Sequence, residues 1–275
     1  MKLRRFNKST ALNGIGILVA AIFLFPVYWM LATSVKNREE IFHTPPTILP
    51  RGLDWSSYTE QFNAQIGGHF LNSVIISVLA MAIVVALSIP SAYGLARYRI
   101  RGAKLVILFL LITQMLPTTL ILTPMFIMFK QAAILNTYLA PILANATLGI
   151  PFSVLMMRPY FLGAPKELED AACIDGCTPF TAFLRIMVPI SSPGIIVSAI
   201  FSFLFAWGDL IFSITFVRNQ NLWPITAAIY NSVGQYGLEW NSVMAFAAIV
   251  VLPVIALFIF LQRYLVAGLT SGAIK

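Results

Sequence analysis

Four of the ten carboxylates in this 275-residue chain lie close together, at Glu167, Glu169, Asp170 and Asp175. Apolar residues recur among and after them at helical spacing, and Gly176 interrupts the pattern. A segment of this kind predicts two short amphipathic helices that meet at a glycine hinge. The apolar positions are Ala171, Ala172, Ile174, Phe180, Phe183, Leu184 and Ile186.

The chemistry available to this segment is the recognition of another protein. Apolar anchors such as Ile174, Phe180 and Phe183 would enter a groove in the partner, with the charges at its rim. The alternative is a helix that lies in the lipid interface, but its four acidic side chains would face an anionic leaflet unfavourably. We therefore expect a partner outside the bilayer to bind residues 167–189.

No group of residues in the sequence has the types and spacing of a catalytic centre. It contains no G-x-x-x-x-G-K-S/T phosphate loop and no cluster of His or carboxylates with metal-ligand spacing. Cys173 and Cys177 have no His nearby, so we expect them to pack at the hinge rather than to bind a metal. We expect no enzyme activity, no metal and no cofactor, and any energy that drives this protein must come from another subunit.

Membrane-spanning helices are the elements that must position this segment. Hydrophobic residues make up 59% of the chain and charged residues 10%, against roughly 25% charged in a soluble domain. A helix needs about 20 mostly apolar residues to cross a bilayer. Six stretches qualify, which predicts one all-α integral membrane domain over residues 1–275. The predicted spans cover residues 12–34, 70–95, 104–129, 138–158, 192–216 and 242–265.

Basic residues are distributed unevenly among the connections between these spans. Thirteen of the 18 Lys and Arg residues fall on one side, and five fall on the other. Lys and Arg near short loops remain in the cytoplasm, so both termini and the connection 159–191 are predicted to be cytoplasmic. The net charge of +8 follows from this topology and does not indicate nucleic acid. The five residues on the opposite side are Lys36, Arg38, Arg51, Lys130 and Arg218.

The two longer external connections, 36–69 and 218–241, are rich in Trp, Tyr and Pro. Such aromatic residues either form a belt at the membrane interface or contact an external partner protein. Both interpretations remain open from the sequence.

Asp209 is the one carboxylate inside a predicted span. A charged group there is costly and normally faces a bundle interior or a watery cavity. It is therefore either a residue of a translocation pathway or gate, or part of a buried hydrogen bond that fixes helix packing. Trp207 lies beside it in the sequence, and Gln114 and Asn145 present weaker versions of the same choice.

The acidic segment resembles the EAA loop of the permease subunits of ABC importers. That pattern is EAA, three residues, Gly, nine residues and Ile-x-Leu-Pro. Here 170–172, Gly176, Ile186 and Pro189 keep every spacing, with Asp for the leading Glu and Val188 for the Leu. By this resemblance the residues that contact an ATPase are Glu167, Glu169, Asp170, Ala171, Ala172, Asp175, Gly176, Phe180, Phe183, Ile186 and Pro189.

The whole chain looks like the second permease of a carbohydrate importer of the maltose-transporter type. Matching features are Asn72-Ser73 at the start of the second span, residues 92–98 at its end, and the terminal residues 268–275. The resemblance implies that the C-terminal tail 266–275 reaches between two ATPase subunits. The tail residues expected to make this contact are Gly268, Thr270, Gly272 and Lys275.

The resemblance further implies a six-span type I ABC importer fold in a prokaryotic cell membrane. Its expected partners are a second permease, a cytoplasmic ATPase homodimer and an external sugar-binding protein. Closure of the ATPase dimer would be transmitted by residues 167–189 and would drive alternating access. A self-sufficient secondary transporter or channel would need coupling-ion carboxylates or an inverted repeat, and a membrane enzyme would need a nucleophile and base. The sequence offers little for either alternative.

Overall fold

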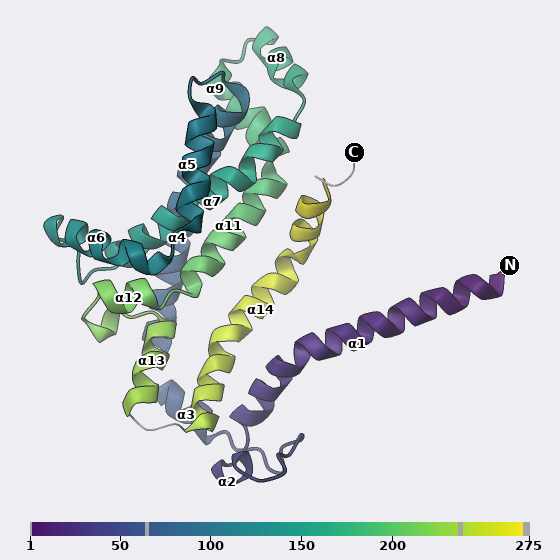
Figure 1. The fold of residues 1–275 in the computed structure, drawn as a ribbon, viewed down its shortest axis with the longest axis vertical. Helices are drawn as coiled ribbons and strands as arrows, with labels where there is room; N and C mark the ends of the chain where they lie inside the picture. Colours follow the sequence, from purple (N-terminus) through teal and green to yellow (C-terminus); the bar gives the residue numbers. More distant parts are fainter. Residues whose placement is uncertain (1, 64–65, 236–238, 272–275) are drawn as a thin grey trace. The chain divides into compact units, whose positions relative to one another are not determined.

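The computed structural model describes residues 2–63, 66–235 and 239–271, and most of these residues are helical (Figure 1). No strand occurs in these ranges, which confirms the predicted all-α fold class. The elements in chain order are α1 Lys2–Ser34, α2 Arg38–Ile41, α3 Ser56–Asn63, α4 Ile66–Arg97, α5 Ala103–Met115, α6 Thr118–Gln131, α7 Leu139–Gly163, α8 Lys166–Ile174, α9 Pro179–Ala182, the π-helical turn η1 Phe183–Met187, α10 Val188–Ile190, α11 Ser192–Trp207, α12 Ile211–Phe216, the 3-10 turn η2 Gln220–Leu222, α13 Ile225–Gln235 and α14 Trp240–Ser271.

Four helical segments of the described chain are each long and apolar enough to cross a membrane. They coincide with four of the predicted spans, because a run of about 20 apolar residues in lipid satisfies its backbone hydrogen bonds within the helix. These segments are Leu12–Ser34, Ile66–Arg97, Leu139–Gly163 and Trp240–Phe260.

The predicted span over residues 104–129 is divided into two helices. The chain forms α5 and α6 instead, and these two helices are bent by 102° relative to each other. Leu116 between them is extended, with φ −74° and ψ 130°. The following Pro117 disfavours helical backbone at the residue before it, so the break has a local cause.

The expected span over residues 192–216 is also interrupted. Helix α11 ends at Trp207, and Gly208, Asp209 and Leu210 separate it from the short α12. A second bend of 76° precedes α11, where it follows the segment Pro179–Ile190. The described residues therefore contain six spans only if each bent helix pair is counted as one.

Contacts within the chain form two compact units, Met1–Ile66 with Ile229–Pro253 and Gly67–Ala228 with Val254–Lys275. In the first unit, the end of α1 is tied to the connection that follows it. Asp54 N donates to Val35 O over 2.9 Å, and the Ser34 and Tyr58 hydroxyls lie 2.7 Å apart. Arg38 forms an ion pair with Glu239 at 3.0 Å. These contacts order a connection that has no core of its own.

The second unit is built around α7, which packs against α5, α11 and α12. Two glycines allow close approach: a Cβ at Gly149 would lie 2.8 Å from Val84 Cγ2, and one at Gly194 would lie 2.6 Å from the Tyr160 ring. Figure 1 shows α8 and α9 at one end of α7, with α6 and α12 at the other.

Candidate functional site

The acidic segment folds as two short helices joined by a glycine. Helix α8 follows Pro165 and has Glu167 and Glu169 in its first turn, where they complement the positive end of the helix dipole. Gly176 follows α8 with φ +93°, a conformation that favours glycine and ends helices. Thr178 then caps α9 by accepting a hydrogen bond from Thr181 N over 3.2 Å. The predicted hinge is present.

One face of this segment points away from the rest of the chain. Ile174 is 86% exposed and Phe180 is 69% exposed, although both are strongly apolar. The carboxylate residues Glu167, Asp170 and Asp175 are exposed around them. Apolar anchors within a charged rim have the composition of a surface that another protein covers.

The expectation that Phe183 is an outward anchor is wrong. Phe183 is 7% exposed, and its ring centre lies 4.5 Å from that of Tyr93. It packs in a core cluster with Phe161 and Met187. The π-helical turn η1 begins at Phe183, and both of its buried side chains, Phe183 and Met187, face inward. Ala172 is likewise buried in its own chain, whereas Pro189 is exposed.

Glu169 also points inward, unlike its neighbour Asp170. Its Oε1 accepts a short hydrogen bond from the Tyr93 hydroxyl, and its Oε2 lies 3.4 Å from Arg97 Nε. Arg97 in turn donates to the Ala164 carbonyl over 2.6 Å. The last turns of α4 therefore hold both the end of α7 and the middle of α8.

Asp209 caps a helix. Its Oδ1 accepts from Phe212 N over 3.0 Å, and its Oδ2 accepts from Ser213 N and Ser213 Oγ over 3.1 and 2.8 Å. The Thr226 hydroxyl donates to its backbone carbonyl. These bonds satisfy donors at the start of α12 that have no partner within the helix. Of the two interpretations, this geometry favours a buried packing bond over a free pathway carboxylate.

Gln114 differs from the other three candidates for the translocation pathway, Asp209, Trp207 and Asn145, because it lines a cavity. It lines a cavity of about 290 Å³ at the bend between α5 and α6, together with Thr113, Phe152, Phe201 and Ser202. Its Nε2 donates to Leu148 O over 3.2 Å. The cavity thus combines aromatic walls with amide and hydroxyl groups, as sites for small polar organic molecules do.

Trp207 and Asn145 do not line this cavity. Trp207 is buried and packs edge-to-face with Phe70 at 5.5 Å and stacked with Phe203 at 5.6 Å. Asn145 is buried and donates to Pro141 O over 2.8 Å within its own helix. Both side chains contribute to helix packing here.

The predicted C-terminal contacts lie at the edge of the described chain. Gly268 and Thr270 belong to the last turns of α14, whereas Gly272 and Lys275 lie outside the described residues. Within the described part of the chain, no three His, Cys, Asp or Glu side chains are placed to share a metal ion, and both cysteines are free thiols.

Tyr93 and Arg97 are site residues that sequence reasoning did not select. The available signal was a Tyr and an Arg one helical turn apart at the end of a long apolar run. Residues four apart share a helix face, so both could have been expected to contact the same neighbour. Which neighbour they contact depends on tertiary packing.

Residues 86–271, two thirds of the sequence, match the family described as "Binding-protein-dependent transport system inner membrane component". The chain belongs to this family. It is therefore a multi-pass component of a membrane transport system, and the segment 167–189, the cavity at Gln114 and the break at Asp209 all lie inside the matched region.

Individual relatives agree over nearly the full length. The chain is 34% identical to the "Probable ABC transporter permease protein YurM" of Bacillus subtilis, over 91% of this chain and 83% of YurM. It is 31% identical to the "Diacetylchitobiose uptake system permease protein DasC" of Streptomyces coelicolor, over 92% of each. A bacterial ABC transporter that imports the acidic polysaccharide alginate has the same fold, with TM-score 0.80, 19% identity and coverage of 95% of this chain and 96% of that one.

Proposed function

We propose that this chain is one of two membrane-spanning subunits of an ATP-driven importer of carbohydrates. Membership of the binding-protein-dependent family and the likeness to DasC support a solute delivered by an external binding protein. The chain contributes the passage and the link to an ATPase that a separate subunit supplies. Its other expected partners are a second permease and a homodimer of that ATPase.

The main support for this proposal is that α8 has an exposed outer side and an inner side bound to α4. Ile174, in the last turn of α8, and the nearby Phe180 of α9 are exposed, so an ATPase subunit can cover them. On the inner side of α8, Glu169 is bound to Tyr93 and Arg97 of α4. Because α4 is one of the long apolar helices, a force applied to the outer side of α8 reaches the membrane-spanning part directly.

The proposed passage includes the cavity at Gln114. Phe152 and Phe201 offer ring faces to the apolar C–H faces of a sugar, while Gln114 and Ser202 offer hydrogen bonds to its hydroxyls. Apolar side chains that line this cavity, Leu116 and Phe205 among them, are exposed in the single chain. We infer that the second permease closes the cavity, so that solute passes between the two subunits by alternating access.

In this arrangement the end of the second unit that carries α8 lies in the cytoplasm, as the basic residues predict. The termini would be cytoplasmic as well. Cysteines introduced at Thr178 and at Asn219, in a chain whose two native cysteines are replaced, test the orientation. An impermeant thiol reagent applied to intact cells should label position 219 and not position 178, and the reverse pattern would invert the topology.

The test of the coupling surface is replacement of its outward anchors. We expect Ile174→Asp and Phe180→Asp to reduce co-purification of the ATPase and to reduce sugar uptake at least about tenfold, because a charge in a desolvated anchor position costs at least 1.4 kcal/mol. Leu53→Asp is the matched control, since Leu53 is 68% exposed but lies far along the chain from α8. It should leave both properties unchanged. Normal ATPase binding and uptake in both anchor variants would contradict the proposal.

A further inference from the structure

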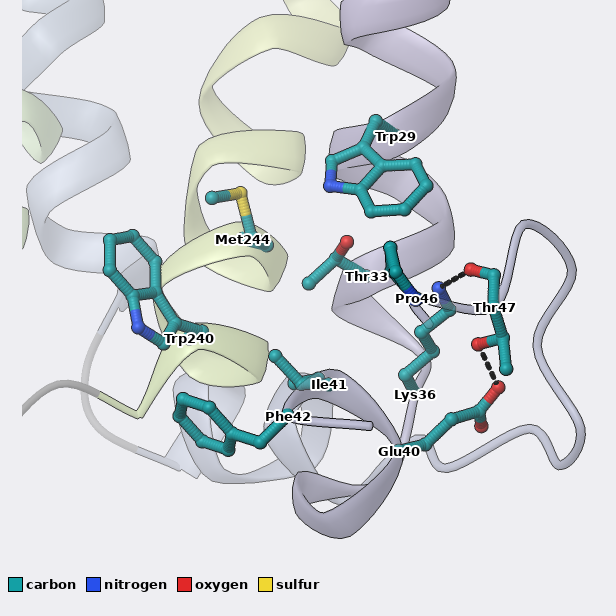
Figure 2. Close-up of a pocket in the computed structure, with 10 residues that line it drawn as sticks. All are labelled: Trp29, Thr33, Lys36, Glu40, Ile41, Phe42, Pro46, Thr47, Trp240 and Met244. Carbon is teal, nitrogen blue, oxygen red and sulfur yellow. Dashed lines mark hydrogen bonds between the residues drawn. The ribbon is translucent and has the colours of Figure 1, made fainter. Parts of the chain in front are cut away.

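A second cavity, of about 320 Å³, lies in the first unit of the chain (Figure 2). The end of α1, the short α2 with the connection after it, and the first turns of α14 enclose it. Its walls include Trp29, Thr33, Lys36, Phe42 and Trp240. None of these residues belongs to the coupling surface or to the cavity at Gln114, and the function proposed above does not use them.

Lys36 brings a buried cation to this cavity. Its side chain is charged although the residue is only 2% exposed. One of its three N–H donors binds the Thr47 carbonyl, and Nζ lies 4.6 Å from the centre of the Trp29 ring. No carboxylate in the described chain lies within ion-pair distance of it. The ammonium group therefore has donors left for a ligand.

Thr33 presents an unpartnered hydroxyl to the same cavity. The residue is 6% exposed, and its Oγ1 has no hydrogen-bond partner in the described structure. Figure 2 shows this hydroxyl on the side of the cavity where Trp29 lies. A buried hydroxyl without a partner is unfavourable. A ligand with a hydroxyl of its own would satisfy it.

The balance of charge selects the class of ligand. Glu40 also lines the cavity and accepts hydrogen bonds from Thr47 Oγ1 over 2.7 Å and Arg51 N over 3.0 Å. The Thr47 bond is the main cause that holds the pKa of Glu40 below its ordinary value, so this carboxylate is ionised at neutral pH. Its charge offsets that of Lys36, which disfavours a phosphate or another anion.

A sugar ring fits the remaining features. Sugars have polar edges that bind donors and acceptors, and apolar C–H faces that lie against aromatic rings. Trp29, Trp240 and Phe42 offer such rings, while Thr33, Lys36 and Glu40 offer polar groups. Small-molecule sites begin at about 300 Å³, so a cavity of this size holds one ring rather than an oligosaccharide.

We propose that this cavity binds one ring of a neutral sugar, separately from the passage between the two permeases. This inference rests on the proposed function as a sugar importer. By the same topology the cavity faces outward, so it would hold solute near the external end of the complex.

The test uses the full complex of both permeases and the ATPase in lipid nanodiscs, without the binding protein. Equilibrium binding of radiolabelled trehalose, maltose and diacetylchitobiose is measured. We expect saturable binding of at least one of them, weakened roughly tenfold by Thr33→Val and more by Trp240→Ala. Thr33→Val is nearly isosteric and removes a hydroxyl that has no partner in the chain, so it should not lower the unfolding temperature without sugar. Leu53→Asn, at an exposed position that lines neither cavity, should leave this binding intact.

Three results would overturn the inference. One is the absence of saturable binding of all three sugars to a complex that transports at least one of them. Another is equal affinity in Thr33→Val and the unmodified complex. The third is a phospholipid adduct, seen by native mass spectrometry, that disappears in Thr33→Val while no sugar binds, which would assign the cavity to a lipid headgroup. Uptake of the same sugars is measured in parallel, with the binding protein present. If the proposed function fails, none of the sugars is transported, whereas the three results above concern a complex that does transport sugar.

Discussion

The guanidinium of Arg97 and the carboxylate of Glu169 lie 3.4 Å apart, with 12% and 13% of their side chains exposed. Arg97 is the last residue of the long apolar helix α4, and Glu169 lies in the middle of α8. Neither Arg97 Nε nor Glu169 Oε2 has a hydrogen-bond partner in the described structure, so the pair depends on charge. Removing one member of a buried pair leaves the other uncompensated, at a cost of about 3–5 kcal/mol.

Glu169→Gln should therefore weaken the link between α8 and α4. We expect the ATPase to bind still, because the outward face is unchanged, but transport per ATP hydrolysed to fall severalfold. The unfolding temperature should also fall, whereas Glu167→Gln, at an exposed position in the same turn, should leave it unchanged. Reconstituted complexes assayed for uptake and ATPase activity provide the measurement. Equal coupling ratios in Glu169→Gln and the unmodified complex would show that the pair only stabilises the fold.

Phe180 and Phe183 should give opposite phenotypes when replaced by Asp. Phe183 is packed against Tyr93 and Phe161, so a charge there is expected to cost more than about 3 kcal/mol and to reduce the amount of folded chain in the membrane. Phe180 is exposed, so Phe180→Asp should accumulate normally and fail at ATPase binding. Fluorescence-detected size-exclusion chromatography and co-purification separate the two. Normal amounts of folded Phe183→Asp would contradict the observed packing.

Gly176 is sensitive to replacement because of its backbone alone. Its φ is +93°, and nothing lies within 4 Å of a Cβ added there. Gly176→Val should cost about 1–3 kcal/mol of strain and misalign α8 and α9, with loss of uptake. Gly176→Asn is the control, since Asn tolerates left-handed backbone better, and it should retain a large part of the uptake. If both variants transport at the unmodified rate, the hinge geometry is not needed for coupling.

Asp209→Asn and Asp209→Leu separate capping from a pathway role. Asn keeps one of the two acceptor oxygens that bind the start of α12, whereas Leu keeps neither. Loss of such a cap costs about 0.5–2 kcal/mol. We expect near-normal uptake for Asp209→Asn, and a lower unfolding temperature with reduced uptake for Asp209→Leu. A fully folded Asp209→Asn complex without uptake would instead favour a charge that acts on the pathway.

The sequence predicted the helical class, the hinge at Gly176 and the positions of four long apolar helices, because these depend on local composition and on the length of apolar runs. It could not assign the faces of α8. Glu169 and Asp170 are adjacent and chemically alike, and only the position of Tyr93 in three dimensions makes one buried and the other exposed. Phe183 was likewise expected to face outward, because its packing against Tyr93 cannot be inferred from the sequence.

The breaks in the helices were partly visible in the sequence. Leu116 precedes a proline, a local signal for the bend that a count of apolar residues overlooks. The sequence signal for the end of α11 at Trp207 is weaker, because a single glycine such as Gly208 is also common inside transmembrane helices. The cap that Asp209 provides depends on α12 starting nearby.

The bend at Leu116 also sets how the protein fits its membrane. Helix α5 has 13 residues, which rise roughly 20 Å at 1.5 Å per residue, against a hydrocarbon layer of about 30 Å. Where lipid rather than the second permease meets this short apolar edge, the bilayer must thin locally, and this thinning costs more elastic energy in a thicker bilayer. The acyl-chain length of the lipids therefore acts on the stability of this side of the protein, so that membrane composition becomes a determinant of its conformation.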